Sequence, residues 1–433
     1  MKKVGMFSMI FMMCPIFLFT QEKSLRVDSS QLPPAETFVF KNKYNQIGVS
    51  GLLQVQFQAA FSKGIQNYNG GNFAPNSNNR FMIRRSRAKI DFKSFTKGHK
   101  LWNQWVFQVD ATERGVSVRD AYAILYENKW DLFNVTAGLT FRPFGHELVY
   151  SSTKRESPER GRMSEVLFRN GRDIGAILTI NDRKKSSKYK NFSAKIGIFN
   201  GPGLAGSREF DSYKDFVFRL ENKKIKLSNT GIYFSAGLSA LLGGVNNINP
   251  LYYYHKGNVL FADSNSANIG KILKKQYFGG DLQLVIPNQK GVTEIRMEYI
   301  SGKQVGTLSS TNTFGDYPLL ANGNNAPLAI RNFNGAYFYF LQNLNSEKHQ
   351  IVLKYDWYNP NTAVKSSEIG SGGNLTAADL AFQTLSAGYN FYIHPNAKLS
   401  LWYDHPINKS TKLTGYQKDL NDDVFTCRLQ INF

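Results

Sequence analysis

The stretch VFTCRLQINF, residues 424–433, alternates apolar and polar side chains without a break. The apolar set consists of Phe425, Cys427, Leu429, Ile431 and Phe433. The polar set consists of Thr426, Arg428, Gln430 and Asn432. Because successive side chains of a strand point to opposite faces, this pattern predicts a strand with one apolar and one polar face. Soluble sandwiches and membrane barrels both contain such strands, so the rest of the chain has to decide between them.

Fifteen further segments with this alternation precede it, at residues 47–61, 80–95, 101–111, 116–126, 133–141, 173–181, 192–199, 215–226, 231–242, 277–286, 292–304, 334–342, 350–358, 379–393 and 398–404. The connections between them alternate between short, as at 96–100, and long, as at 142–172 and 243–276. Short periplasmic turns and long external loops are typical of a membrane-spanning barrel. We therefore predict an all-β fold, a transmembrane antiparallel barrel of about sixteen strands with long external loops.

Charged residues occupy alternate positions of the second segment, at Arg85, Arg87 and Lys89, while the apolar residues Ala88, Ile90 and Phe92 occupy the other face. A Lys or Arg facing lipid near the midplane costs about 2–4 kcal/mol, and several would rival a typical folding stability of about 5–15 kcal/mol. We therefore expect these side chains to face the lumen. The same argument predicts a polar, water-filled interior lined also by Gln104, Gln108, Asp110, Arg219, Glu221, Lys223, Glu294, Arg296 and Glu298.

The N-terminal twenty residues start with Lys2 and Lys3 and continue as an apolar run from residue 6 to residue 19. This run is shorter than the about 20 residues of a spanning helix and is typical of a secretory signal. We assign residues 1–20 to a signal peptide, 21–46 to a short periplasmic lead and 47–433 to the barrel. The expected location is the outer membrane of the cell.

The formal net charge of the chain is +21, which indicates an anionic partner. Export argues against nucleic acid and favours small anions. Enzyme motifs are absent: the chain has no Gly-x-Ser-x-Gly, and its six His residues lack metal-ligand spacing. We expect neither catalytic activity nor a cofactor or metal, and we interpret His146 as a polar loop residue. Only Cys427 remains after signal removal, so no internal disulfide is expected.

Residues 138–175, GLTFRPFGHELVYSSTKRESPERGRMSEVLFRNGRDIG, include a connection of about thirty residues that is rich in both signs of charge. Loops of this length are usually functional or disordered. This connection would be external loop three, and we predict that it folds into the barrel and narrows the channel. A solvated surface loop is the alternative. Its arginines could bind anions or pair with Glu156, Glu159 and Glu165, and the sequence leaves both readings open. Arg172 and Asp173, at the loop exit, are assigned a structural role.

Several motifs, in this order, resemble the phosphate-selective porin O/P family of Gram-negative outer membranes. They are FMIRRSR at 81–87, DAY at 120–122, Gly-x-x-Phe-Arg-Pro-Phe-Gly at 138–145 and NGRDIG at 170–175. The terminal Phe433 is similar to the last residue of outer-membrane barrel proteins, where the final strand is the assembly signal. The resemblance implies a sixteen-stranded homotrimeric porin in outer-membrane lipid, inserted by the barrel-assembly machinery, with loop three folded inward.

The resemblance also implies a row of basic residues on the wall, matched by Arg85, Arg87 and Lys89. It further implies basic residues at the constriction, for which the candidates are Arg155, Arg160 and Arg162. Arg142 is assigned with them to the residues that line the pore and bind anions. The wall residues have no acid among them before Asp91, so we expect them to be unpaired and free to attract anions. The predicted function is passive diffusion of small anions, with phosphate as the favoured example. The alternatives are a general porin with a weak anion bias, a surface scaffold or adhesin, and a soluble exported β protein.

Overall fold

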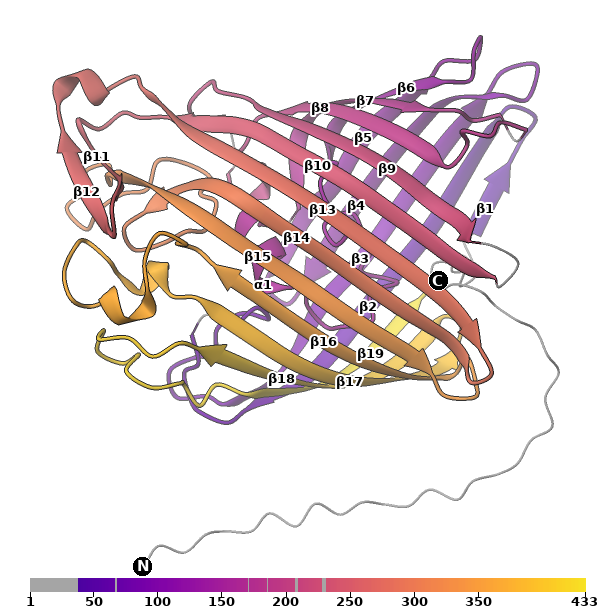
Figure 1. Ribbon diagram of the computed structural model, residues 1–433. Coiled ribbons are helices and arrows are strands. Elements are labelled where there is room, and N and C mark those ends of the chain that lie inside the picture. Colours follow the sequence, from indigo (N-terminus) through magenta and orange to yellow (C-terminus); the bar gives the residue numbers. More distant parts are fainter. Residues whose placement is uncertain (1–37, 67, 170, 185, 207–208, 228–230) are drawn as a thin grey trace, which may run out of the picture.

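Sixteen antiparallel strands form a closed barrel in the described part of the computed structural model (Figure 1). The structure describes residues 38–66, 68–169, 171–184, 186–206, 209–227 and 231–433. The predicted signal peptide, most of the predicted lead and Asn170 of the NGRDIG motif lie outside the described residues. The prediction of a sixteen-stranded antiparallel barrel is confirmed.

The wall strands follow one another around the barrel in chain order, and β19 pairs with β2 to close the sheet. They are β2 (Asn45–Ala60), β3 (Asn79–Phe95), β4 (Leu101–Thr112), β5 (Gly115–Tyr126), β6 (Phe133–Phe141), β7 (Arg172–Asn181), β8 (Phe192–Phe199), β9 (Asp215–Leu227), β10 (Ile232–Asn246), β13 (Ile272–Asn288), β14 (Gly291–Thr307), β15 (Leu328–Asn343), β16 (His349–Asn359), β17 (Phe382–His394), β18 (Ala397–Asn408) and β19 (Val424–Asn432). Each of the sixteen predicted segments corresponds to one of them.

Three strands lie outside this sequence of wall strands. The strand β1 (Phe38–Lys41) pairs with the start of β2, while β11 (Leu251–Lys256) and β12 (Val259–Ser264) form a hairpin within the loop between β10 and β13. The helical elements are α1 (Arg162–Leu167) and the 3₁₀ turns η2 (Gly203–Ala205), η3 (Ser266–Asn268), η4 (Ser366–Glu368) and η5 (Ala377–Asp379). Among the described residues, none of the helices has the length and apolar character needed to cross a membrane.

The closing strand β19 shows why the alternation places one face outward. Phe425, Leu429 and Ile431 remain 39%, 40% and 42% exposed, whereas Thr426 and Arg428 are 0% and 3% exposed. The apolar set therefore forms the outer surface, where lipid would contact it, and the polar set points into the barrel. This is the orientation expected from the sequence.

An apolar core fills one side of the barrel interior. Phe144 and Phe168 of the connection between β6 and β7 lie with ring centroids 4.9 Å apart, and Phe168 meets Tyr277 of β13 at 5.7 Å. Other members of this core are Leu148, Met163, Leu167, Phe199, Phe333, Tyr337, Tyr339 and Tyr358. The prediction of a wholly polar, wet interior is therefore wrong on this side, because β13, β15 and β16 also place aromatic side chains on their inward face.

The long loops pack on one another at the end of the barrel opposite the short turns. Leu260 of β12 lies in one apolar cluster with Ile369, Leu375 and Leu380 of the loop between β16 and β17. A second cluster joins Val305, Leu328 and neighbouring aromatic residues. The hairpin β11–β12 thus belongs to an ordered assembly of loops. The C-terminal residue Phe433 lies at the short-turn end (Figure 1).

Gly138 of β6 shows how close backbone approach constrains the wall beside the long connection to β7. Its φ is +125°, and a Cβ atom there would lie 2.3 Å from the carbonyl oxygen of Ala121 on β5. Gly115 at the start of β5 has a similar φ of +127°, but nothing lies within 4 Å of the point that a Cβ atom would occupy there. A substitution at Gly115 therefore introduces backbone strain alone, whereas a substitution at Gly138 introduces backbone strain together with a steric clash.

We predict that Gly138→Ala destabilises the refolded barrel more than Gly115→Ala does. Unfavourable φ costs about 1–3 kcal/mol at either site, and only Gly138→Ala adds a clash with backbone atoms that cannot rotate away. The measurement is the urea concentration at which half of the detergent-refolded protein is unfolded. Unfolding is detected as the difference in gel mobility between the folded and the heated barrel. Equal losses in the two variants would contradict the prediction.

Candidate functional site

The connection between β6 and β7, residues 142–171, is loop three, and it lies inside the barrel together with α1 (Figure 1). Its backbone is hydrogen-bonded to two strands of the wall. The amide of His146 donates to Glu298 of β14 at 2.9 Å, and the amide of Arg162 donates to Asp356 of β16 at 3.1 Å. The prediction that loop three folds into the barrel is confirmed.

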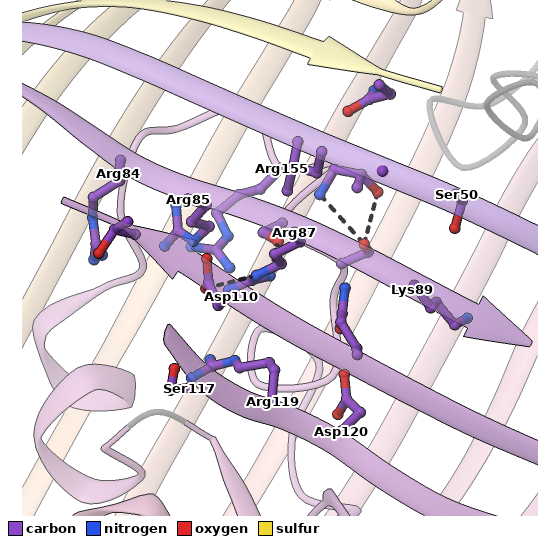
Figure 2. A pocket seen from close by; sticks show the side chains of 18 of the residues that line it. Ser50, Arg84, Arg85, Arg87, Lys89, Asp110, Ser117, Arg119, Asp120 and Arg155 are labelled. Carbon is purple, nitrogen blue, oxygen red and sulfur yellow. Dashed lines mark hydrogen bonds and ion pairs between the residues drawn. The ribbon is translucent and has the colours of Figure 1, made fainter. Parts of the chain in front are cut away.

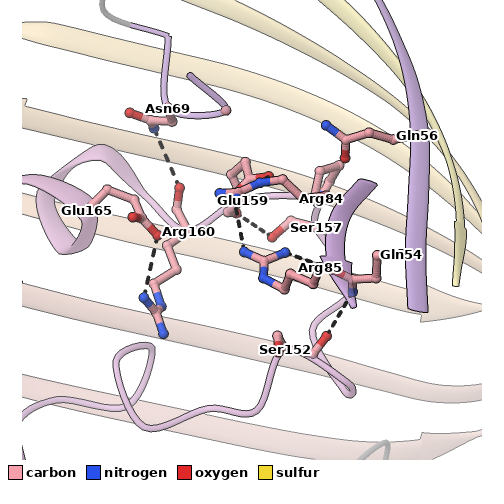
Figure 3. Close-up of polar contacts among 12 residues, drawn as sticks. Gln54, Gln56, Asn69, Arg84, Arg85, Ser152, Ser157, Glu159, Arg160 and Glu165 are labelled. Atoms are coloured by element: carbon pink, nitrogen blue, oxygen red, sulfur yellow. Dashed lines mark hydrogen bonds and ion pairs between the residues drawn. The ribbon is translucent and has the colours of Figure 1, made fainter. Parts of the chain in front are cut away.

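Glu159 of loop three is held by three arginines of the wall. Arg84 donates to it at 2.7 Å, Arg428 at 2.9 Å and Arg85 at 3.4 Å. Figure 3 shows Glu159 between Arg84 and Arg85. Burial would raise the pKa of the Glu159 carboxyl, but the three guanidinium groups around it outweigh burial and hold that pKa well below its usual range.

Glu156 forms a second charged contact with the wall. It accepts from Arg296 of β14 at 2.7 Å. The sequence suggested that the acids of loop three could pair with arginines of the same loop, and Arg160 with Glu165, at 3.5 Å, is such a pair. Glu156 and Glu159 instead pair with wall residues far away in the chain, so they position loop three and do not neutralise Arg155.

A cavity of about 620 Å³ remains between loop three and the strands β2 to β5 (Figure 2). Its lining extends from Asn396 and Phe433 at the short-turn end to Arg114 and Gly115 at the turn between β4 and β5. Ten of the lining residues are basic, namely Arg84, Arg85, Arg87, Lys89, Arg114, Arg119, Lys154, Arg155, Arg160 and Arg172. Three are acidic, namely Asp110, Asp120 and Glu165. Basic residues therefore outnumber acidic ones in the lining of the cavity.

Two of these basic residues, Arg84 and Arg119, lie at β-bulges and were not identified from the alternation. Pairing shifts from Gln54↔Arg85 to Val55↔Ile83, which leaves Arg84 as an extra residue, and a similar shift occurs at Arg119. A bulge allows two consecutive residues to leave the strict alternation of faces. The consecutive arginines at 84–85 are the signal that could have indicated it.

The three predicted wall residues line the cavity, but each has an acid within reach. Arg87 donates to Asp110 of β4 at 2.8 Å, Arg85 contacts Glu159, and the Lys89 ammonium lies 3.7 Å from Asp91. The expectation that these residues are unpaired is therefore wrong. Strand pairing places Asp110 directly opposite Arg87, a neighbour that the order of residues within β3 alone does not reveal.

Of the predicted anion-binding residues in loop three, Arg155 and Arg160 line the cavity, whereas Arg142 and Arg162 do not. Arg142 is buried with its Nη1 atom 3.6 Å from Asp215. The guanidinium of Arg162 lies 4.1 Å from the ring centroid of Phe382. Both side chains contribute to the packing of loop three against the wall and do not reach the cavity.

Arg155 differs from the other arginines of the cavity. It is 5% exposed, and its buried Nε and Nη1 atoms donate no hydrogen bond to any described residue. Within the described part of the chain, no carboxylate oxygen lies within the 4 Å of an ion pair with it. A buried guanidinium with unused donors is costly unless a partner supplies acceptors. Arg155 is therefore the strongest candidate for contact with an anion.

Arg172 and Asp173 at the loop exit have separate partners. Arg172 donates to Asp120 of β5 at 3.0 Å and stacks on Phe141, with its guanidinium carbon 3.6 Å from the ring centroid. Asp173 accepts from the amide of Gly201 at 2.7 Å. These contacts join the end of loop three to β5 and to the connection between β8 and β9.

His146 does not add positive charge to the lumen. Burial, followed by the charge of Arg296, lowers the pKa of its imidazole to about 3, so the ring is neutral at pH 7. Within the described ranges, no three His, Cys, Asp or Glu residues are grouped as a metal site would require. The charge of the cavity therefore comes from its arginines and lysines.

Comparison with solved structures identifies the architecture. An anion-selective porin from Comamonas acidovorans matches with a TM-score of 0.54 at 10% identity, over 90% of this chain and 100% of that one. OprB from Pseudomonas putida matches with a TM-score of 0.55 at 8% identity, over 89% of this chain and 94% of that one. OmpF from Salmonella typhi matches with a TM-score of 0.52 at 12% identity, over 92% of this chain and 100% of that one. The chain has the fold of outer-membrane porins.

No protein-family profile matches the chain, and no curated protein sequence matches it either. At 8–12% identity, the solved porins show a common fold and leave the permeating solute undetermined. The resemblance to the phosphate-selective porin O/P family therefore remains a proposal, as do the anion-binding roles of the residues in the cavity.

We predict that Glu159→Gln loosens loop three. The substitution leaves three wall arginines without their buried countercharge, and removing one partner of such a group costs about 3–5 kcal/mol. The expected results are a lower thermal midpoint of the folded barrel and a larger, noisier single-channel conductance. Because the pKa of Glu159 is depressed, its contribution is complete above about pH 4.5 and is lost only as the pH falls through the folded-state pKa.

Glu165→Gln is the matched control for this prediction. Glu165 makes a single 3.5 Å contact with Arg160, and its side chain is 23% exposed. Such a pair contributes about 0–1 kcal/mol. A control variant that loosens the barrel as much as Glu159→Gln does would show that Glu159 has no special role in holding loop three.

Proposed function

We propose that this chain is an outer-membrane porin through which small anions diffuse passively, with inorganic phosphate as the favoured solute. The observation that carries the proposal is the cavity beside loop three, where ten basic residues face three acidic ones. Rings of Arg or Lys in a narrow aqueous pore raise the local concentration of anions and oppose cations. The absence of ion-pairing acids around Arg155, among the described residues, supports a role in attracting the solute.

Arg155 is close enough to Arg85, Arg87 and Arg160 to interact electrostatically with each of them. Glu159 and Asp110 compensate part of this charge, and Glu165 compensates part of the charge of Arg160. A permeating anion between these groups would reduce their mutual repulsion and accept from the unused donors of Arg155. The paired arginines would shape the passage, and Arg155 would attract the permeating anion most strongly.

Phosphate is favoured because the motifs at 81–87, 120–122, 138–145 and 170–175 resemble the phosphate-selective family. The same resemblance is the basis for proposing a homotrimer in outer-membrane lipid, inserted by the barrel-assembly machinery with Phe433 as part of its signal. The proposed anion preference rests on the charges of the cavity and does not depend on these finer points.

The first experiment is a conductance measurement in planar bilayers with a chloride gradient. We expect reproducible open levels and a reversal potential that reports preference for chloride over potassium. Added phosphate should reduce the chloride current if it enters the same passage. A surface scaffold would give no reproducible open level, and a general porin would give a preference that phosphate does not alter.

We predict that Arg155→Gln lowers the permeability to chloride by about fivefold and lowers the anion-to-cation permeability ratio by at least that factor. A unit charge about 4 Å from the ion contributes about 1 kcal/mol in water, which corresponds to that factor. Arg162→Gln is the matched control, because it removes the same charge from the same loop at a residue outside the cavity. Its permeability ratio should remain near that of the wild type.

Salt concentration provides a second control for this effect. Exposed charges are screened over about 8–10 Å at roughly 0.1–0.15 M salt, so the difference between Arg155→Gln and the wild type should shrink as salt rises. If Arg162→Gln changes selectivity while Arg155→Gln does not, the cavity beside β2 to β5 is not the anion path. Cation preference in the wild-type channel would overturn the proposed function itself.

A further inference from the structure

Lysines dominate the turns at the short-turn end of one half of the barrel. These turns follow β3, β5 and β7 and span residues 96–100, 127–132 and 182–191, of which residue 185 lies outside the described residues. The exposed lysines on them, which we call the basic rim, are Lys97, Lys100, Lys129, Lys184, Lys188 and Lys190. No acidic residue among the described residues of these turns is exposed to the same degree.

The acids of these turns point toward the turns themselves. Glu127 accepts hydrogen bonds from the backbone amides of Lys129, Trp130 and Leu132. Asp182 accepts from the amide of Lys184 at 3.0 Å, and Asp131 accepts from the Lys100 ammonium at 2.8 Å. Within the described chain, the other five lysines of the basic rim have no carboxylate within 4 Å. The carboxylates of these turns are therefore occupied by hydrogen bonds within the turns, while most of the lysines extend into the surroundings of the barrel.

Exposed aromatic side chains lie beside these lysines. Trp130 is 56% exposed with the Lys129 ammonium 5.2 Å from its ring centroid, and Tyr189 is 60% exposed with the Lys188 ammonium at 5.1 Å. Trp and Tyr concentrate at the level of lipid headgroups, and nearby lysines extend their ammonium groups to the phosphates. Directly along the wall, exposed apolar residues such as Leu125, Val135 and Phe192 continue the lipid-facing band.

We propose that the basic rim binds the headgroups of anionic phospholipids in the periplasmic leaflet of the membrane. The proposal rests on the membrane location within the proposed function, because short turns face the periplasm in barrels of this class. It does not depend on which solute passes through the channel. The basic rim differs from the cavity, since its lysines are exposed on the turns and none of them lines the cavity.

The test compares purified wild-type protein with K184Q/K188Q/K190Q by native mass spectrometry in detergent, titrated with phosphatidylglycerol or with phosphatidylcholine. We expect the wild type to retain phosphatidylglycerol in preference to phosphatidylcholine. A lysine near an anionic surface contributes about a fivefold gain in affinity, so the triple variant should bind phosphatidylglycerol at least about fivefold more weakly. High salt should reduce the wild-type affinity toward that of the variant.

The matched control is K409Q/K412Q/K418Q, which removes three exposed lysines from the loop between β18 and β19 at the opposite end of the barrel. It should bind phosphatidylglycerol within about twofold of the wild type. A gel-mobility shift on heating verifies that every variant is folded, and bilayer conductance verifies that the channel is open. Normal conductance together with lost lipid binding separates this proposal from the proposed function.

Three results would overturn the inference. The first is equal retention of phosphatidylglycerol and phosphatidylcholine by the wild type. The second is an equal loss in the two triple variants, which would indicate a general effect of net charge. The third is unchanged lipid binding in K184Q/K188Q/K190Q accompanied by reduced chloride selectivity or reduced sedimentation with purified peptidoglycan. That result would assign the basic rim to the channel mouth or to the cell wall.

Discussion

The structure depends on the hydrogen bonding of β19 to β2. A sheet placed in lipid cannot leave the backbone groups of an edge unpaired, and closure of the barrel removes both edges at once. Closure in turn fixes which side chains face inward around the whole wall, because each strand takes its register from its neighbour. Arg428 thereby comes to lie opposite loop three, where it contacts Glu159.

Loop three then divides the enclosed space. Phe144, Phe168 and their aromatic neighbours on β13, β15 and β16 remove water from one side, and this leaves the charged side chains of β2 to β5 on the other. The ion pairs of Glu156 and Glu159 with the wall hold the loop between the two regions. Hydrophobic packing and charge pairing therefore act on the same segment, the first on its apolar side chains and the second on its acids.

The sequence was sufficient to predict the sixteen strands because the alternation recurs in sixteen segments that short and long connections separate in turn. The cost of placing several Lys or Arg side chains in lipid then assigned the charged face of each strand to the interior. The sequence was also sufficient to place loop three inside, and to assign Arg85, Arg87 and Lys89 to the lumen side. It could not show that Asp110 faces Arg87, since that contact joins two strands. It also did not identify Arg84 and Arg119 as lining residues, because strict alternation of faces does not describe a β-bulge. It did not predict the aromatic core, because the polar character of some inward positions was assumed for all inward positions.

The division of the interior by loop three has a consequence for how such a protein can change over generations. The apolar residues that pack against the loop lie mainly on β13 to β16, while the basic residues of the cavity lie mainly on β3, on β5 and on the loop itself. Arg84 and Arg85 of β3 belong to the cavity and also hold Glu159 of the loop. If the solute passes through the cavity as proposed, a substitution at Arg84 or Arg85 changes both the passage and the anchoring of the loop. Under the proposed function, permeability and the stability of the loop are thus coupled at β3, and adaptation of the first requires compensating changes in the second.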